Sequence, residues 1–194
     1  MKRVLVTGGT VRLGLAMVEC LRARGWDVVT SSHRPYSGAD FMADFTKSGA
    51  AEKLFSRVGH IDALVNNAGL FGEAEGLRAV NYDSPRRLIE LMSASGGAVV
   101  NILDASHGEG EYYVLKAKLA AYTVDAAKLY APKLRVNGVA PGAVFAPEGA
   151  HVKAGRNLVG RPKAEDVASA VAFLLENGSV TGTIIPVDGG SHIA

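Results

Sequence analysis

Residues 4–14, VLVTGGTVRLG, decide the fold expected of this chain. The apolar run Val4–Val6 predicts a buried strand, the glycines after it predict a tight turn, and the apolar spacing that begins at Leu13 predicts a helix. A turn between a strand and a helix points several backbone N–H groups at one spot, where the helix dipole also favours negative charge. Phosphate is the usual occupant of such a turn, so this end of the chain is expected to hold a nucleotide.

Strand-like and helix-like segments alternate along the rest of the chain. β-branched runs predict strands at Arg3–Thr7, Asp27–Ser31, Asp40–Asp44, Ala63–Asn66, Ala98–Leu103, Arg135–Val139 and Thr183–Val187. Apolar residues at helical spacing predict helices at Leu13–Arg24, Ser48–Val58, Leu77–Ala94, Glu111–Ala131 and Lys163–Glu176. Strands apolar on both faces that alternate with helices indicate an α/β fold, in which one parallel sheet is covered on both sides. We expect a single domain over residues 1–194.

One connection departs from this alternation. Only His33–Ala39, which contains proline and glycine, lies between the second and third expected strands. That stretch is too short for a crossover helix, although an extended loop is long enough to return along the sheet. The helix between these two strands is therefore expected to be shortened or missing.

Composition and charge exclude several classes of protein. A net charge of +2 without a basic stripe gives no reason to expect nucleic acid or a membrane surface as partner. No apolar run is long enough to cross a bilayer, and a strand that begins at Arg3 leaves no room for a signal peptide, so we expect a cytoplasmic protein. The lone cysteine is expected to pack in the core. No metal site is expected, because the histidines lack metal-ligand spacing: His60, His107, His151 and His192.

The end of the second expected strand, Ser31-Ser32-His33-Arg34, bears on the kind of nucleotide. A ribose with a free 2′-hydroxyl is usually held by an acidic residue at this point, whereas a 2′-phosphate needs positive charge. The chain offers no carboxylate there, and Arg34 carries a guanidinium suited to phosphate. Arg12 adds a second cation inside the Gly-rich turn. Arg34 as a plain solvated turn residue is the alternative, but its position favours NADP(H) over NAD(H).

A second signal is the segment Tyr112-Tyr113-Val114-Leu115-Lys116. Tyr112 and Lys116 are four residues apart, so they share one face of the expected helix. A nearby ammonium favours the phenolate, so Lys116 is expected to lower the pKa of Tyr112 and to suit it for proton transfer. Tyr113, whose neighbour four residues along is Ala117, is assigned to packing. In an unknown fold the same pair would be an ordinary surface pair.

Further signals follow in a fixed order: Asp44, Asn66-Asn67-Ala68-Gly69, Asn81, Pro141-Gly142 and Val187-Asp188-Gly189-Gly190. With Thr7–Gly14 and Tyr112…Lys116, they resemble the short-chain dehydrogenase/reductase family over the entire chain. The resemblance implies a doubly wound sheet of the Rossmann type, with Tyr112 as proton donor, Lys116 bonded to the cofactor ribose and Asn81 holding a relay water. It also implies a cofactor site made of Gly8, Thr10, Arg12, Leu13, Gly14, Ser32, His33, Arg34, Asp44, Phe45, Asn67, Ala68, Gly69, Tyr112, Lys116, Pro141 and Gly142.

Within that family the details resemble pteridine reductases, including the dihydromonapterin- and dihydrofolate-type members. Arg12 stands where most members have a glycine, and His33-Arg34 matches the 2′-phosphate-binding stretch. Phe71 matches the ring that stacks on the pterin, with an ordinary core or lid phenylalanine as the alternative. Asp104 stands where most members have the catalytic serine. It is expected to hydrogen-bond a substrate ring nitrogen, unless it is an exposed strand-end carboxylate and Ser106 replaces the serine.

Three segments are shorter than the family pattern, namely those before Tyr112, between Gly69 and Asn81, and after Pro141-Gly142. A small or open substrate pocket is the expected consequence. An NADPH-dependent pteridine reductase is the preferred reading. The alternatives are a reductase of ketones or 3-oxoacyl thioesters and a non-catalytic NADP(H)-binding sensor. The resemblance further implies a homodimer or homotetramer that acts on a small molecule.

Overall fold

The computed structural model describes residues 1–106, 108–145 and 157–194. Its centre is one sheet of seven parallel strands in the order β3-β2-β1-β4-β5-β6-β7. The strands are β1 (Arg3–Thr7), β2 (Asp27–Ser32), β3 (Phe41–Met42), β4 (Ala63–Asn66), β5 (Gly97–Ile102), β6 (Leu134–Pro141) and β7 (Ile184–Val187). The order reverses between β1 and β4, and ligands of such sheets bind at the carboxyl ends of the strands beside this reversal. The predicted doubly wound α/β fold is confirmed.

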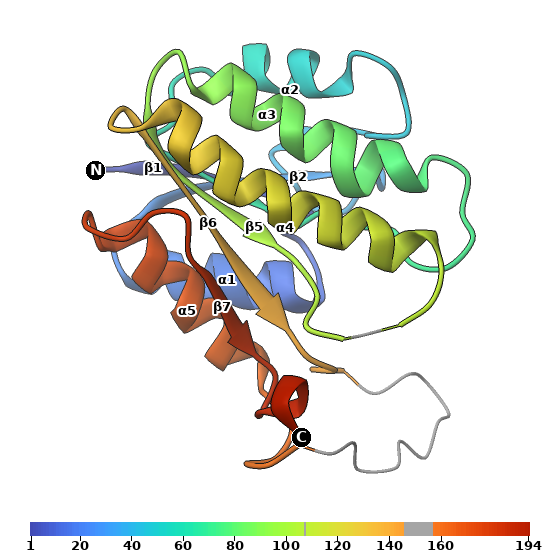
Figure 1. Ribbon diagram of the computed structural model, residues 1–194. Coiled ribbons are helices and arrows are strands. Elements are labelled where there is room, and N and C mark those ends of the chain that lie inside the picture. Colours follow the sequence, from blue (N-terminus) through green and yellow to red (C-terminus); the bar gives the residue numbers. More distant parts are fainter. Residues whose placement is uncertain (107, 146–156) are drawn as a thin grey trace.

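Helices cover both faces of the sheet (Figure 1). One face carries α1 (Arg12–Ala23) and α5 (Ala164–Glu176), and the other carries α2 (Ala50–Val58), α3 (Ser84–Met92) and α4 (Glu111–Tyr130). Successive strand residues point to opposite faces, so Val4 and Val6 join the core against α1 and α5, while Leu5 joins the core against α2 and α3. Burial on both faces explains the unbroken apolar run that opens the chain.

The connection between β2 and β3 contains no helix, as predicted. Asp40 holds this connection against β2, since its Oδ2 accepts hydrogen bonds from both the backbone N–H and the hydroxyl of Thr30, each 2.8 Å long. The prediction of a third strand over Asp40–Asp44 was too long, because only Phe41 and Met42 pair with β2. The connection that leads to the edge strand β3 is therefore held against β2 by the Asp40 side chain and not by a helix.

The single helix expected over Leu77–Ala94 is wrong in detail. The chain first forms a π-helical turn, Ala79–Asp83, and only then α3. Asn81 Nδ2 donates to the carbonyl of Leu77, 3.0 Å away, and Pro85 has no N–H to donate to the carbonyl of Asn81. The Ser84 N–H donates to Ala79, five residues back. Regular α-helical bonding is thus interrupted beside Asn81.

Across the three described stretches, no helix combines the length and the apolar character that crossing a bilayer requires.

Candidate active site

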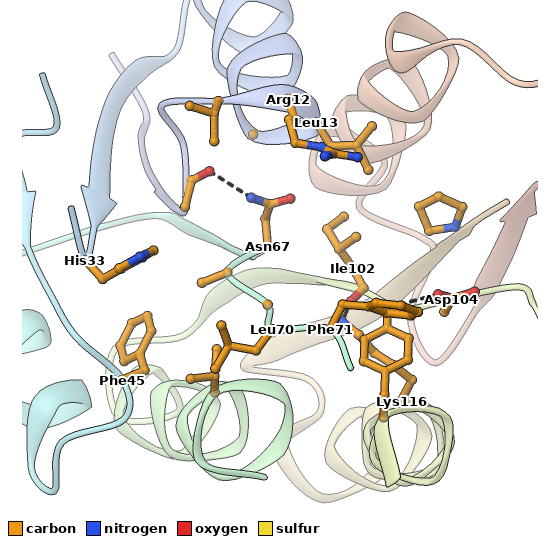
Figure 2. Close-up of a pocket in the computed structure, with 18 of the residues that line it drawn as sticks. Arg12, Leu13, His33, Phe45, Asn67, Leu70, Phe71, Ile102, Asp104 and Lys116 are labelled. Atoms are coloured by element: carbon orange, nitrogen blue, oxygen red, sulfur yellow. Dashed lines mark hydrogen bonds between the residues drawn. The ribbon is translucent and has the colours of Figure 1, made fainter. Parts of the chain in front are cut away.

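A cavity of about 640 Å³ opens at the carboxyl ends of the central strands, beside the reversal in strand order. Its wall includes the first glycine turn, the ends of β2, β4, β5 and β6, and the first turns of α4. Figure 2 shows its length: His33 and Phe45 lie at one end and Phe71, Asp104 and Lys116 at the other. The structure brings every residue expected at the site to this cavity except Asn81.

The glycine turn closes tightly over the start of α1. Gly8 has a φ of +64°, and its N–H donates to the carbonyl of Ser31 over 2.8 Å. A Cβ added to Gly14 would lie 2.0 Å from the carbonyl oxygen of Gly8, so only glycine allows the helix to start this close to the strand. Asn67 fastens the turn, because its Nδ2 donates to the carbonyls of Thr7 and Gly8 at 2.9 and 3.0 Å. These contacts aim the amino end of α1 at the cavity.

Arg12 lies in the middle of this turn, at the position where the family that the sequence resembles usually has glycine. Its φ of +52° lies in the left-handed region, which explains the preference for glycine there. The guanidinium lies 4.7 Å from the centre of the Phe145 ring, so a cation–π contact spans the rim between the turn and the segment after β6. Arg12 and Leu13 are the first two residues of α1 and lie together at the cavity (Figure 2).

The end of β2 carries the groups expected to read the nucleotide. His33 and Arg34 are exposed at the cavity, and the N–H of Arg34 donates to the hydroxyl of Ser32 over 3.1 Å. Ser31 also lines this cavity, and its hydroxyl is buried and has no hydrogen-bond partner among the described residues.

Asp44 and Phe45 form the neighbouring wall. The Asp44 carboxylate accepts hydrogen bonds from the Thr46 hydroxyl at 2.7 Å and from the Thr46 N–H at 3.0 Å. These bonds hold the pKa of the Asp44 carboxyl below its usual value. The carboxylate therefore caps the turn after β3 and stays charged beside the cavity.

Tyr112 and Asp104 form a direct pair at the other end of the cavity. The Tyr112 hydroxyl donates to Asp104 Oδ2 over 2.9 Å, and the Ser106 N–H donates to Asp104 Oδ1 over 2.7 Å. Burial raises the pKa of the Tyr112 phenol well above its ordinary value, and the negative charge of Asp104 adds to this shift. The expectation that Lys116 lowers the pKa of Tyr112 is therefore wrong, because the phenol is buried and the charge bonded to it is negative.

Lys116 is buried below the cavity floor. Its Nζ donates to the carbonyl of Ile102 over 2.8 Å and lies 5.8 Å from the centre of the Tyr112 ring. Burial lowers the pKa of Lys116 to about 8, against the opposing effect of the Asp104 charge. The ammonium is thus directed at a strand carbonyl and not at the phenol oxygen.

Tyr113 is a cavity residue that the sequence interpretation missed. Its ring packs against those of Phe71 and Tyr112, in agreement with the assignment to packing, but Tyr113 also lines the cavity. The short segment before Tyr112 brings Gly108 close to this ring, and helical spacing alone does not indicate that contact. Ser106 lines the cavity too, but its contact with Asp104 is made by the backbone and not by the hydroxyl.

Asn81 does not line the cavity. Its Nδ2 donates to the carbonyls of Leu70 and Leu77, and its buried Oδ1 has no partner among the described residues. That oxygen would lie 3.2 Å from a Cβ at Gly69, so Asn81 supports the loop that forms the floor. His107, His151 and much of the segment expected to form a short lid after Pro141-Gly142 lie outside the described residues.

The cavity fits a dinucleotide. A helix amino end stands over a glycine that no side chain could replace, the exposed side chains of His33 and Arg34 line one end of the cavity, and a phenol and an ammonium stand at the other. Its volume is also in the range of small-molecule and cofactor sites, which is about 300–1,000 Å³.

Known families match both halves of the chain. A profile described as NAD dependent epimerase/dehydratase family matches residues 4–111, and one described as Enoyl-(Acyl carrier protein) reductase matches residues 82–192. The cis-4-hydroxycyclohexanecarboxylate dehydrogenase of Sinomonas cyclohexanicum is 32% identical, with 96% of this chain and 94% of the relative covered.

Solved structures agree with these matches. FolM alternative dihydrofolate reductase 1 from Brucella suis, in complex with NADP, has a TM-score of 0.86 at 30% identity, with 100% of this chain and 96% of that chain covered. A protein described as a short chain dehydrogenase/reductase family protein has a TM-score of 0.89 at 29% identity, with 100% and 98% covered. The chain belongs to the short-chain dehydrogenase/reductase family of NAD(P)-dependent oxidoreductases.

Proposed function

We propose that this oxidoreductase is an NADPH-dependent pteridine reductase, which reduces a small dihydropterin- or dihydrofolate-type substrate. The hydrogen bond from the Tyr112 hydroxyl to Asp104, beside the exposed ring of Phe71, is the observation that carries the proposal. A carboxyl group and a ring together suit a flat, nitrogen-rich heterocycle, because one makes polar contacts at its edge and the other stacks on its face. Similarity to a FolM alternative dihydrofolate reductase adds support.

The cofactor would lie along the length of the cavity. The amino end of α1, with Gly8, Thr10, Arg12, Leu13 and Gly14, would hold the pyrophosphate. Ser32, His33 and Arg34 would hold the 2′-phosphate, and Asp44 and Phe45 would lie at the adenine. The middle and far end of the cofactor would contact Asn67, Ala68, Gly69, Lys116, Pro141 and Gly142. Structural relatives bound to NADP and NADPH support NADP(H) as the cofactor.

The chain's own residues then supply the proton and the geometry. A bound dihydronicotinamide supplies the hydride. Tyr112 donates the phenol proton to the substrate atom that becomes electron-rich, and Asp104 fixes the direction of the phenol hydroxyl beforehand. The raised pKa of Tyr112 keeps the phenol protonated through the neutral range, so the proton is present when a substrate binds. We propose that Lys116 bonds the cofactor ribose and that Asn81 supports proton resupply through the loop it holds.

Replacement of Tyr112 tests the proposal directly. Tyr112→Phe keeps the ring and removes the proton, so turnover should fall about 10²- to 10⁴-fold. NADPH binding, measured by titration of NADPH fluorescence, should remain within about twofold because the deleted hydroxyl donates to Asp104. Oxidation of NADPH with dihydropterins and dihydrofolate as substrates is the assay. Retained turnover would assign the proton to another group.

A carbonyl reductase is the second candidate, favoured by the similarity to cis-4-hydroxycyclohexanecarboxylate dehydrogenase. Cyclohexanone and butan-2-one in the same NADPH assay separate the two candidates. Reduction of these ketones, with no reduction of dihydropterins, would establish the carbonyl reductase in place of the pteridine reductase.

We also propose that the single domain of residues 1–194 assembles as a homodimer or homotetramer through α3 and α4. Leu129 on α4 is 69% exposed, and Arg86 of α3 lies over the Tyr122 ring of α4 at 5.9 Å. Such apolar and aromatic surface is typical of interfaces. Light scattering should give two or four times the 20.2 kDa of the chain, and a monomer mass would contradict the assembly.

A further inference from the structure

Gly108, in the short connection between β5 and α4, lies close to the ring of Tyr113. A Cβ added to Gly108 would lie 2.3 Å from both Cε2 and Cζ of Tyr113, so there is no room for a side chain between residue 108 and the ring. Any side chain at position 108 would have to displace the ring. The connection therefore fixes Tyr113 in place at the cavity wall.

Tyr113 belongs to a cluster of three rings. Its centroid lies 5.1 Å from that of Tyr112 at 83°, and 6.4 Å from that of Phe71 at 89°. Phe71 in turn lies 4.9 Å from Tyr112 at 70°. Rings at these distances and angles make edge-to-face contacts. The cluster stands directly beside the phenol hydroxyl that Asp104 orients.

The two outer rings of the cluster differ in how firmly they are held. Phe71 is 72% exposed and is followed by Gly72, which has a φ of +81° and open space where a Cβ would be. Tyr113 is only partly exposed and is confined between Gly108 and Tyr112. Phe71 therefore contacts the cluster from the solvent side, whereas Tyr113 has neighbours on two sides.

We propose that Tyr113 forms one wall of a site for flat ring systems and determines selectivity for planar substrates. The proposal rests on the proposed function in that it concerns the same cavity. The inference adds Tyr113 to the site beside the Tyr112–Asp104 pair. It also gives a role to the short connection before α4, because Gly108 in that connection leaves space for the Tyr113 ring. A planar ligand beside Tyr113 gains contact with its ring, and an acyclic ligand gains little.

Binding of pterin, the unreduced parent ring, tests this wall without any turnover. Isothermal titration at saturating NADP⁺ would give the pterin dissociation constant for the wild type and for Tyr113→Leu, Gly108→Ala and Tyr113→Phe. Tyr113→Leu removes the ring and Gly108→Ala displaces it, so each should weaken pterin binding about tenfold. Tyr113→Phe keeps the ring and should stay within about twofold of the wild type.

Two controls separate the wall from a general disturbance. Val114→Ala changes an exposed neighbour on the same helix and should leave pterin binding unchanged. The double variant Tyr113→Leu with Gly108→Ala should bind pterin no more weakly than Tyr113→Leu alone, because both changes remove one contact. Thermal melting verifies that each variant is folded, and Tyr113→Leu alone decides the matter if Gly108→Ala does not fold.

The outcomes distinguish this inference from the proposed function. Unchanged pterin binding in Tyr113→Leu overturns the inference, and so does a wild type that does not bind pterin. Pterin binding that depends on Tyr113, without any reduction of dihydropterins, supports the wall and refutes the pteridine reductase. Reduction of dihydropterins that does not respond to Tyr113→Leu supports the reductase and refutes the wall.

Discussion

The Asp104 carboxylate influences two titratable groups of the active site. Its charge contributes to raising the pKa of the Tyr112 phenol, and it opposes the burial that lowers the pKa of Lys116 to about 8. Lys116 is therefore the first of the two to lose its proton as the pH rises. A reaction that needs the ammonium of Lys116 should lose activity as the pH passes through about 8, while Tyr112 is still protonated.

Asp104→Asn tests this coupling through the pH profile. Without the carboxylate charge, nothing opposes the effect of burial on Lys116, so its pKa should fall below about 8. The alkaline limb of kcat/KM should then move to lower pH, together with a loss in rate from the disturbed phenol. The measurement is kcat/KM for NADPH-dependent reduction between about pH 6 and 10, a span set by the ordinary pKa values of His and Lys. An alkaline limb that stays in place or moves upward would contradict the coupling.

Arg34 should decide between the two nicotinamide cofactors. Arg34→Ala removes the exposed guanidinium at the end of β2, and a charged hydrogen bond to phosphate contributes about 1.5–3 kcal/mol. The KM for NADPH should rise about 10- to 100-fold, while the KM for NADH changes little. Arg161→Ala provides the matched control, because Arg161 is exposed and does not line the cavity. An equal loss with both cofactors would mean that Arg34 does not read the 2′-phosphate.

Which residues gather at the cavity was predictable from the sequence, but how they interact was not. The ends of β1, β2, β4 and β5 meet at one edge of a parallel sheet, so motifs at those ends converge. The partner of Lys116 depends on how deeply α4 packs, and this depth directs the ammonium to Ile102. The position of the Tyr113 ring depends on its closeness to Gly108 in the connection before α4, and helical spacing in the sequence does not predict that contact.

The junction of β1 and α1 should be sensitive to one methyl group. Gly14→Ala would put a Cβ 2.0 Å from the Gly8 carbonyl and 2.9 Å from Asn67 Nδ2, so the helix must move away from the strand. Such overpacking costs about 1–3 kcal/mol in the free energy of unfolding. Urea denaturation should show this loss, and NADPH binding should weaken because the amino end of α1 shifts. Gly178→Ala, with open space at its Cβ and no positive φ, should lower stability far less.

Strands and helices that follow one regular apolar pattern were easier to predict than those whose bounds depend on particular side-chain hydrogen bonds. The strands β1 and β4 lie where the apolar runs predicted them, and α4 begins at the predicted Glu111. The π-helical turn at Ala79–Asp83 was not predictable in this way, because it depends on the Asn81 side chain and on Pro85 and not on the apolar repeat. β3 is short because Asp40 bonds to Thr30 and does not extend the strand.

The order of the sheet joins early and late parts of the chain into one cooperative structure. β1 pairs with both β2 and β4, and α1 packs against α5 in a core shared with β4 and β5. Trp26, the single tryptophan, reports on this contact because its indole N–H donates to Glu176 at the end of α5 over 3.3 Å. Neither the first nor the second half of the chain buries its apolar surface alone.

Unfolding should therefore be a single transition. In urea, tryptophan fluorescence and far-ultraviolet circular dichroism should give the same midpoint, since the α1–α5 contact and the sheet share one core. NADPH at about 100 times its dissociation constant should add about 2.7 kcal/mol to the free energy of unfolding. Both signals should shift together, because the cofactor cavity draws on strands from both halves. A fluorescence change that precedes the loss of circular dichroism would instead mean that α1 and α5 separate before the sheet unfolds.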